Sequence, residues 1–221
     1  MDADYQRPIV TVDLTLFTIA NGRLCVALQR REKPPFAGEF ALIGGYVHVD
    51  EDADALAAAR RILRAKAGLS GVFLEQLMTF SGPKRDPRGW SASIAYYALA
   101  PEPVLAISSS LGIALTPVDA IGPLPFDHNE IVAQGARRLR TKGAYSSLPI
   151  NLLPATFTMP QLREVYETVM GVKLNDSAFR RKIDELEIVE PVPGAFSKES
   201  ARPAQLFRSR RAARQEFDRR I

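Results

Sequence analysis

Three neighbouring carboxylates, Asp50, Glu51 and Asp52, stand directly before the stretch 53–67, which contains neither Pro nor Gly. Carboxylate oxygens are hard ligands of the kind that Mg²⁺ takes from proteins, so the cluster has the chemistry of a metal site. At the start of a helix, the same side chains would instead cap free backbone amides and interact favourably with the helix dipole. Both interpretations fit the spacing, and we favour helix capping.

The adjacent arginines Arg180 and Arg181 are a second group that suits specific chemistry. The planar guanidinium fork matches the acceptors of phosphates and of the guanine edge, so the pair suits contact with DNA. Phe179, Ile183 and Leu186 recur at spacings of four and three, which predicts a helix that buries them and turns the arginines outward. The alternative is a solvated arginine pair on a surface helix.

The segments around this pair predict a helix-turn-helix with a β-wing. Thr158 has the residue type of a helix N-cap, which predicts that a helix begins there. A short connection after this helix leads to Asn175 or Asp176 as the N-cap of the next one. Residues 188–192 and 202–208 are expected to form the two strands of the wing. The residues expected to contact DNA are Lys173, Ser177, Arg180, Arg181, Lys182, Lys198 and Arg202.

The N-terminal part predicts a mixed sheet. Residues 11–19 alternate polar and apolar types, Asn21-Gly22 is a strong hairpin signal, and residues 24–28 return as a second strand. A helix is expected over 53–67 because its apolar residues recur at helical spacing. Further strands are expected at 40–43, 72–80 and 92–100.

Another helix is expected over about 127–142. Asp127 and Glu130 have the spacing of a capping box, and the apolar Phe126 precedes them. We interpret His128, within this cap, as a solvent-facing residue, because no second ligand for a metal stands nearby.

The charge divides the chain into two parts. Residues 1–126 carry 12 basic and 13 acidic side chains, whereas residues 127–221 carry 17 and 12, and the formal net charge is +4. A basic second part indicates either a polyanionic partner or a solvated basic surface. We therefore expect a first domain over 1–144, whose last helix leads into the linker, and a second domain over 145–221.

Composition excludes several classes of protein. With 46% hydrophobic and 24% charged residues, the chain is neither disordered nor collagen-like. No apolar run approaches the roughly 18–20 residues of a membrane helix, and the acidic N-terminus does not resemble a secretory signal. A single cysteine excludes an internal disulfide, and two histidines argue against a zinc site. We expect a cytoplasmic protein with no metal site and no required cofactor.

The segment 45–69 resembles a Nudix box, which runs glycine, five residues, glutamate, seven residues, then Arg-Glu-apolar-x-Glu-Glu-x-Gly-apolar. Its glycine, glutamate, arginine and final glycine are matched by Gly45, Glu51, Arg61 and Gly68. Ile62, Ala65 and Lys66 replace the three helix glutamates, and nine residues separate Glu51 from Arg61. Because Nudix hydrolases hold Mg²⁺ with carboxylates of this helix, we expect the scaffold without hydrolysis. Carboxylates from elsewhere, such as Glu75 or Asp86, are the alternative ligands.

Together the two parts resemble the Nudix-related transcriptional regulators of the NrtR family. Beyond the box, the resemblance is carried by Pro35-Phe36-x-Gly38, Arg85-Asp86-Pro87-Arg88-Gly89, Phe126-Asp127-His128-x-Glu130-Ile131, Phe179-Arg180-Arg181-Lys182 and Arg202-Pro203-Ala204. It implies an α+β protein, with a Nudix-like α/β/α sandwich followed by a C-terminal winged helix-turn-helix.

The resemblance also implies a function. It suggests a homodimeric regulator, with repression as its expected action, that binds a palindromic operator of NAD, nucleotide or sugar metabolism genes. A metabolite such as ADP-ribose would bind the first domain without catalysis and release the DNA. Cations suit its pyrophosphate and aromatic rings suit its adenine. The candidate ligand-binding residues are Arg30, Phe40, Arg60, Arg85, Asp86, Arg88 and Trp90.

Two alternatives belong to other classes. One is a true Nudix pyrophosphatase acting on ADP-ribose or another nucleotide sugar, against which Ile62, Ala65 and Lys66 stand. The other is a nucleotide-binding module whose C-terminal domain contacts a protein partner.

Overall fold

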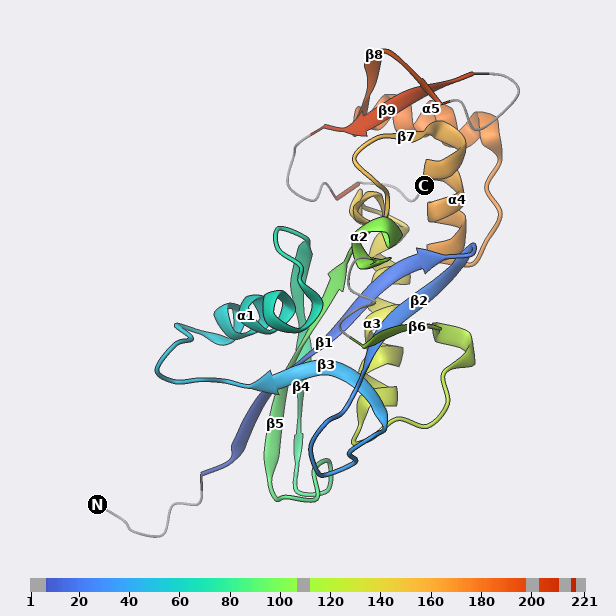
Figure 1. The fold of residues 1–221 in the computed structure, drawn as a ribbon. Helices are drawn as coiled ribbons and strands as arrows, with labels where there is room; N and C mark the ends of the chain where they lie inside the picture. The colour runs from blue at the N-terminus through green and yellow to red at the C-terminus, as the bar shows by residue number, and fades with distance from the viewer. Residues whose placement is uncertain (1–6, 107–111, 198–202, 211–215, 218–221) are drawn as a thin grey trace.

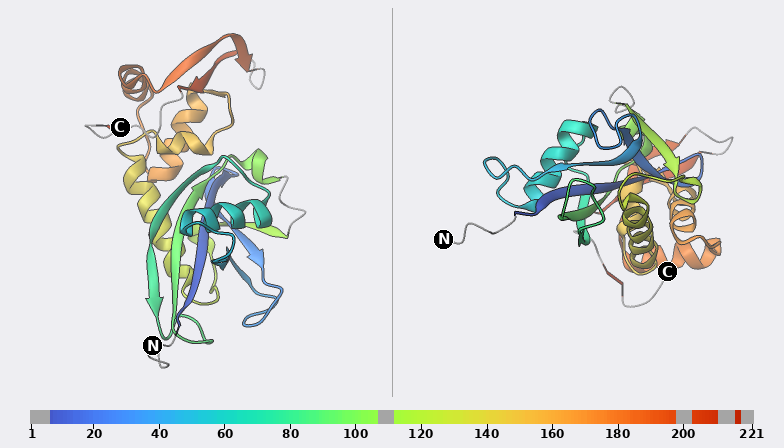
Figure 2. Two further views of the ribbon diagram at one scale, coloured as in Figure 1. Left: turned by 90° about the vertical axis from the view of Figure 1, so that its left-hand side faces the viewer. Right: turned by 90° about the horizontal axis from the view of Figure 1, so that it is seen from below.

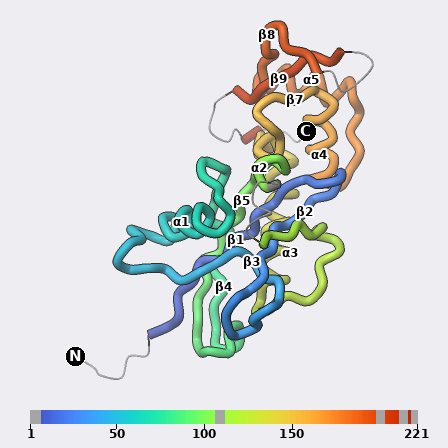
Figure 3. Tube along the Cα trace, viewed as in Figure 1, coloured from blue at the N-terminus to red at the C-terminus, as the bar shows by residue number. Residues whose placement is uncertain are grey.

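The computed structural model describes residues 7–106, 112–197, 203–210 and 216–217. Two of the expected DNA contacts, Lys198 and Arg202, lie outside these residues. Figure 3 follows the chain from the sheet and helices of the N-terminal half to the C-terminal unit at the top of the view. No helix in the described ranges is both long and apolar enough to cross a membrane.

Six strands form one sheet in the N-terminal half (Figure 1). They are β1 (Ile9–Ala20), β2 (Arg23–Arg30), β3 (Phe40–Tyr46), β4 (Phe73–Gly82), β5 (Ser91–Leu99) and β6 (Ile113–Pro117). Their order is β4-β5-β1-β3-β2-β6, and β1 pairs in addition with β2. Only β1 and β5 run parallel among these pairs; the others are antiparallel. The strands expected from the sequence are confirmed, whereas β6 was not predicted.

The β1–β2 hairpin confirms the Asn-Gly signal. Asn21 and Gly22 have φ angles of 50° and 70°, which is the left-handed conformation that a two-residue hairpin turn requires. The turn aligns Phe17 with Val26, and both side chains are fully buried. A one-residue shift would turn these apolar residues to the opposite face of the sheet.

Helix α1 (Ala55–Ala67) covers one face of the sheet (Figure 2). Its N-cap is Asp54, whose side chain accepts a hydrogen bond of 2.7 Å from the Ala57 amide, and Gly68 ends it with φ 67°. The expectation that Asp50–Asp52 cap this helix is wrong, because Asp54 is the N-cap and these residues precede it. The apolar side of α1 packs against the strands through Ile62 and Leu63.

Helix α3 (His128–Gly143) covers the opposite face (Figure 2), and the short helix α2 (Glu102–Ala106) follows β5. Ile131 and Leu139 of α3 are fully buried in one cluster with sheet residues such as Phe17. The expected capping box is wrong: Asp127 is the N-cap residue, but its side chain makes no capping hydrogen bond. Its carboxylate binds an arginine instead, as described below.

The C-terminal part is a helix-turn-helix with a wing. It comprises a 3₁₀ helix (Leu148–Leu152), β7 (Phe157–Thr158), α4 (Met159–Met170), α5 (Asp176–Leu186), β8 (Val189–Ser197) and β9 (Ala204–Ser209), and its sheet has the order β7-β9-β8. Thr158 and Gln161 form a reciprocal capping box, and Asn175 caps α5. The predicted N-cap at Thr158 and the predicted wing strands are confirmed.

The hydrophobic core continues from the first part into the second. One cluster of buried residues joins Phe17 of β1, Leu139 of α3 and Tyr166 of α4. The Tyr166 hydroxyl donates a 3.0 Å hydrogen bond to the Ser146 carbonyl, just after α3. Because α3 contributes to this shared core, it connects the two parts physically; the boundary at 144/145 stays a prediction.

Candidate functional site

A cavity of about 890 Å³ opens on the sheet, between the end of α1 and the loops around it. Six basic and three acidic side chains contribute to its wall, so its interior is positively charged on balance. The basic residues are Arg30, Arg31, Lys33, Lys66, Arg85 and Arg88, and the acidic ones are Asp13, Glu32 and Asp86. This charge suits an anionic ligand.

The carboxylate of Asp13 lies at the base of the cavity, on β1. It accepts a 2.6 Å hydrogen bond from the Ser93 hydroxyl, and the Arg85 guanidinium lies 3.6 Å from it. A Cβ at Gly44 would lie 2.2 Å from an Asp13 oxygen, so only glycine fits on the neighbouring strand. The pairing of the two strands and the lack of a side chain at Gly44 therefore leave room for the Asp13 carboxylate.

Arg85 joins the cavity to the start of α3. Its Nε and one terminal nitrogen each donate a 2.8 Å hydrogen bond to the two oxygens of Asp127. The Arg85 side chain is only 7% exposed, and it donates a further bond to the Ser91 hydroxyl. A buried bidentate pair of this kind fixes both the loop and the helix N-terminus.

His128, expected to face solvent, is buried with 3% exposure, so that expectation is wrong. Its Nδ1 accepts a 3.1 Å hydrogen bond from the Leu42 amide, which leaves the proton of the neutral ring on Nε2, 3.6 Å from Asp13. Burial lowers the pKa of His128, and this favours the neutral form. The ring therefore has a partner that local sequence does not indicate, the backbone of β3.

Asp86 and Arg88 form a second charge pair at the cavity wall. The guanidinium of Arg88 donates bonds of 2.9 and 2.6 Å to Asp86, and Arg88 also donates to the Tyr46 hydroxyl. Burial of the Asp86 carboxyl opposes ionisation, but the hydrogen bonds from Arg88 outweigh it and lower the pKa of Asp86. Asp86 is thus an ionised positioning group for Arg88.

Two aromatic rings stand beside these charges. Phe36 and Phe126 meet edge to face with ring centroids 5.0 Å apart, and the Arg31 guanidinium lies 4.9 Å from the centroid of Phe126. Both phenylalanines have positive φ angles, 63° and 58°, which are uncommon for bulky residues. Phe126 lines the cavity and offers an aromatic surface next to the cations.

The structure brings together part of the ligand set expected from the sequence. Arg30, Arg85, Asp86 and Arg88 line the cavity. Phe40, Arg60 and Trp90 do not contribute to its lining: Phe40 packs under the Arg30 guanidinium at 4.8 Å, Arg60 is exposed on α1, and Trp90 is 50% exposed.

Several residues that line the cavity are not in that expected set. They are Asp13, Arg31, Tyr46, Lys66, Phe126 and His128. Arg31 follows Arg30 directly, so the cluster of basic residues was a visible signal. Lys66 stands at a glutamate position of the box, which was also visible.

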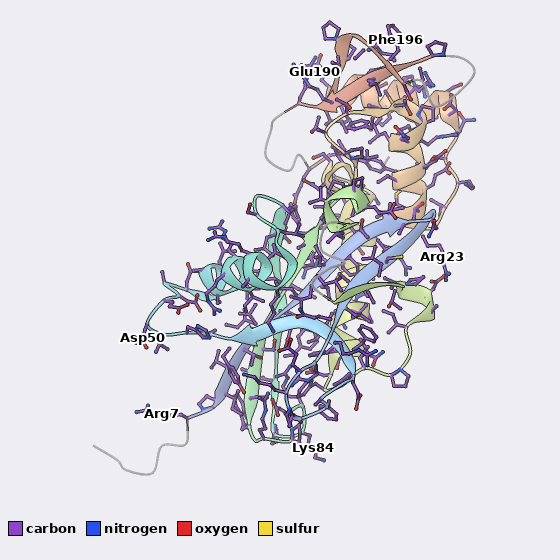
Figure 4. All side chains as sticks on the ribbon, viewed as in Figure 1. Arg7, Arg23, Asp50, Lys84, Glu190 and Phe196 are labelled. Atoms are coloured by element: carbon purple, nitrogen blue, oxygen red, sulfur yellow. The ribbon has the colours of Figure 1, made fainter. Side chains whose placement is uncertain are left out.

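The carboxylates before α1 are engaged with an arginine rather than with the cavity. Arg61 donates bonds of 2.8 and 2.7 Å to Asp52, and its nearest nitrogen lies 3.5 Å from Glu51. The hydrogen bond from Arg61 is the main reason that the pKa of Asp52 falls to about 2. Asp50 lies in the loop that precedes α1, at the left of the view in Figure 4. Within the described ranges, no group of three or more His, Cys, Asp or Glu residues could hold a metal.

The two alternative metal ligands are also engaged. Glu75 accepts a 2.5 Å hydrogen bond from Lys142 and lies 3.5 Å from Arg138, between β4 and α3. It does not line the cavity. Asp86 lines the cavity but belongs to the pair with Arg88.

Helix α5 presents the arginine pair on the surface. Phe179 and Ile183 are buried against the rest of the helix-turn-helix, whereas the Arg180 and Arg181 side chains are 51% and 79% exposed. Ser177 is exposed and Lys182 partly exposed on the same helix. Strand β8 of the wing follows α5 in the chain, and Figure 4 labels Glu190 and Phe196 on this strand.

The turn between α4 and α5 is held by Glu167. This carboxylate is 8% exposed, and it accepts a 2.8 Å bond from the Lys173 ammonium and a 2.9 Å bond from the Leu174 amide. The remainder of the Lys173 side chain is open to solvent. Lys173 therefore has a structural partner in addition to its expected role at DNA.

Comparison with known proteins gives the C-terminal part a family. Residues 149–209 match the model of the NrtR DNA-binding winged helix domain. Over 211 residues the chain is 35% identical to the ADPR responsive transcriptional repressor NtrR of Acinetobacter baylyi, covering 93% of this chain and 84% of that protein. The chain belongs to the NrtR family.

Solved structures extend the similarity over both parts. NrtR of Shewanella oneidensis, crystallised with a 27mer DNA, is 30% identical, with a TM-score of 0.88 and coverage of 96% of this chain and 99% of that one. Its NUDIX domain, crystallised with ADP ribose, is 26% identical, with a TM-score of 0.53 and coverage of 63% and 94%. The Nudix domain and winged helix expected from the sequence are therefore confirmed for this NrtR-family chain.

Proposed function

We propose that this protein is a transcriptional repressor that binds operator DNA through its winged helix-turn-helix and releases it when ADP-ribose or a related nucleotide enters the cavity. The observation that carries the proposal is the joint presence of a cation-lined cavity and an exposed arginine helix in one NrtR-family chain. The regulated genes would belong to NAD, nucleotide or sugar metabolism.

The cavity has the chemistry that such an effector needs. Its volume of about 890 Å³ lies within the range of small-molecule sites. Guanidinium and ammonium groups can bind the two phosphates, and the Phe126 ring can stack with the adenine. Arg30, Arg85, Asp86 and Arg88 remain our candidates for ligand contact, and Arg31, Lys66 and Phe126 join them. Phe40, Arg60 and Trp90 lack the support of the cavity lining.

The DNA-binding surface in this proposal is centred on α5. Arg180 and Arg181 would contact base edges or phosphates, with Ser177, Lys182 and Lys173 beside them. Lys198 and Arg202 would act from the wing. We further propose a homodimer that recognises two palindromic half-sites, because a symmetric dimer presents two identical reading helices. A regulator of this type acts on DNA in the cytoplasm.

Hydrolysis is not part of the proposed function. In the Nudix box the helix carries the carboxylates that hold Mg²⁺, and here Ile62, Ala65 and Lys66 stand at those positions. Glu51 and Asp52 are engaged by Arg61. We therefore propose that the effector is bound without being cleaved and that no cofactor is required.

The test of this function compares two readouts on the full-length protein. Fluorescence anisotropy should show tighter binding to the promoter region of its own or a neighbouring gene than to a scrambled duplex of equal length, at each of two salt concentrations. Incubation with ADP-ribose and Mg²⁺ should yield no AMP. Equal affinity for both duplexes would contradict the DNA-binding function, and Mg²⁺-dependent AMP release would favour the pyrophosphatase.

A further inference from the structure

Lys66 projects from the last turn of α1 to the cavity wall. Its ammonium donates a 2.5 Å hydrogen bond to the carbonyl of Gly44 on β3, and both residues line the cavity. A backbone carbonyl is an oxygen ligand of the type that Mg²⁺ binds. Here that oxygen is bound by a cation that belongs to the protein itself.

The residues around this point do not fit the Mg²⁺ ion that the Nudix scaffold implies. The box helix offers the ammonium of Lys66 and the methyl group of Ala65 to the cavity, and neither can ligate a metal. A divalent ion near the Gly44 carbonyl would also be repelled by Lys66. The donor set therefore disagrees with a metal site.

Within the described ranges, Lys66 and Arg31 differ from the arginines Arg61, Arg85 and Arg88 in having no ion pair. Arg61, Arg85 and Arg88 are each paired with an aspartate. For Arg31 and Lys66, no ion pair is formed with any residue that the structure describes. Among the residues that the structure describes, the Arg31 guanidinium donates hydrogen bonds only to the backbone carbonyls of Pro35 and Lys33.

The cations of this part of the cavity repel one another. Loss of surrounding water lowers the pKa of Lys66, and the positive charge of Arg31 lowers it further. Desolvation followed by the charge of Arg88 lowers the pKa of Arg31. Asp13 acts in the opposite direction on both groups but does not pair with either. An anion between them would remove this repulsion.

We propose that Lys66 and Arg31 bind the diphosphate group of the effector directly, and that the Lys66 ammonium replaces a metal ion there, so that effector binding is independent of divalent cations. The inference rests on the proposed function where it takes ADP-ribose as the diphosphate. An ammonium has three donors, so the bond to Gly44 leaves two for phosphate oxygens. The planar Arg31 group supplies a fork of further donors.

The experiment is calorimetric titration of the full-length protein with ADP-ribose and, separately, with inorganic pyrophosphate, in excess EDTA and in Mg²⁺. We expect the wild-type protein to bind both compounds in EDTA, with no tighter binding of ADP-ribose when Mg²⁺ is added. Lys66→Gln should weaken ADP-ribose binding about tenfold or more, the loss of one charge-assisted hydrogen bond. The matched control is Arg64→Gln, an exposed residue of the same helix outside the cavity lining, which should bind like the wild type.

The outcomes separate this inference from the proposed function. Binding of ADP-ribose only with Mg²⁺, or unchanged binding by Lys66→Gln, would overturn the inference and leave ADP-ribose as the effector. Binding of pyrophosphate but not of ADP-ribose in EDTA would support the diphosphate site and contradict the proposed effector. Binding of neither compound under any condition would contradict both. The wild-type comparison in EDTA and Mg²⁺ needs no variant, so the test does not depend on folding of Lys66→Gln.

Discussion

The guanidinium of Arg85 donates two hydrogen bonds, both 2.8 Å long, to the two carboxylate oxygens of Asp127. Arg85 lines the cavity, and Asp127 is the residue from which α3 begins. Helix α3 in turn contributes Leu139 to the core that contains Tyr166 of the helix-turn-helix. The pair is thus the first step of a continuous packed connection between cavity and DNA-binding part, the kind of connection that coupling requires.

Removal of Arg85 should strongly destabilise the fold. In Arg85→Met the carboxylates of Asp127 and Asp13 would lose their cation in a buried setting, and we expect a loss of about 3–5 kcal/mol in the free energy of unfolding. Urea denaturation measures it. Arg60→Met, which changes an exposed arginine, should lie within about 0.5 kcal/mol of the wild type. Equal stability of the two variants would show that the pair contributes little.

Glu167 should stabilise the turn of the helix-turn-helix in a pH-dependent way. The hydrogen bond from Lys173, followed by that from the Leu174 amide, lowers the pKa of Glu167. A lowered folded-state pKa means that the contribution is complete above the unfolded-state pKa and is lost as the pH falls through the folded-state value.

Glu167→Gln should therefore cost about 1.5–3 kcal/mol at neutral pH, the value of hydrogen bonds to a charged group. Its difference from the wild type should shrink as the solution is acidified, which urea denaturation at several pH values would show. Glu164→Gln, an exposed residue of the same helix, is the control and should show no such trend. A constant difference at all pH values would refute the role of the Glu167 charge.

Close packing of α3 on the sheet should make Gly135 irreplaceable. A Cβ at this position would lie 2.8 Å from the Thr15 hydroxyl and 3.1 Å from the Phe17 ring, and both neighbours are fully buried. Overpacking of this kind costs about 1–3 kcal/mol, so Gly135→Ala should lower the melting temperature. Gly122→Ala, where nothing lies within 4 Å of the new Cβ, is the control. An unchanged melting temperature for Gly135→Ala would contradict the close contact.

Arginine at position 181 should contribute to operator recognition. Its side chain is 79% exposed, and its ion pair with Glu185 is long at 4.0 Å, so the guanidinium is available to DNA. Arg181→Ala should weaken operator binding by about 1–3 kcal/mol if the residue contacts a base, with a smaller effect on a scrambled duplex. Anisotropy titration of both duplexes measures the difference. Arg140→Ala, an exposed arginine of α3, should leave operator affinity unchanged, and the same result for Arg181→Ala would place recognition elsewhere.

The capping residues show where local sequence is sufficient and where it is not. Thr158 and Gln161 form a capping box whose two partners lie three residues apart, within reach of a local pattern. Asp127 has an equally good local signal, yet its carboxylate binds Arg85, 42 residues away in the sequence. A tertiary ion pair of this kind is invisible to a pattern of four residues. The prediction for His128 is wrong for the same reason, since the partner of its ring is the distant Leu42 amide.

The sequence predicts the charge of the cavity but not which residues line it. The sequence indicated arginines for an anionic ligand, and four of the seven candidate residues line the cavity. Trp90 has a residue type that suits adenine, but it is half exposed and lies outside the cavity lining. Phe126 provides an aromatic surface instead, and its positive φ of 58° follows from loop geometry that composition does not reveal.

The central claim is that the cavity and the DNA-binding surface influence each other, and reciprocal titration tests it most directly. Operator affinity is measured by anisotropy with and without saturating ADP-ribose, and ADP-ribose affinity by calorimetry with and without saturating operator. Linkage requires the two affinities to fall by the same factor, typically about 5- to 150-fold for coupled sites. Equal factors in this range are the predicted result. Operator affinity that is unchanged at saturating ADP-ribose would contradict the account.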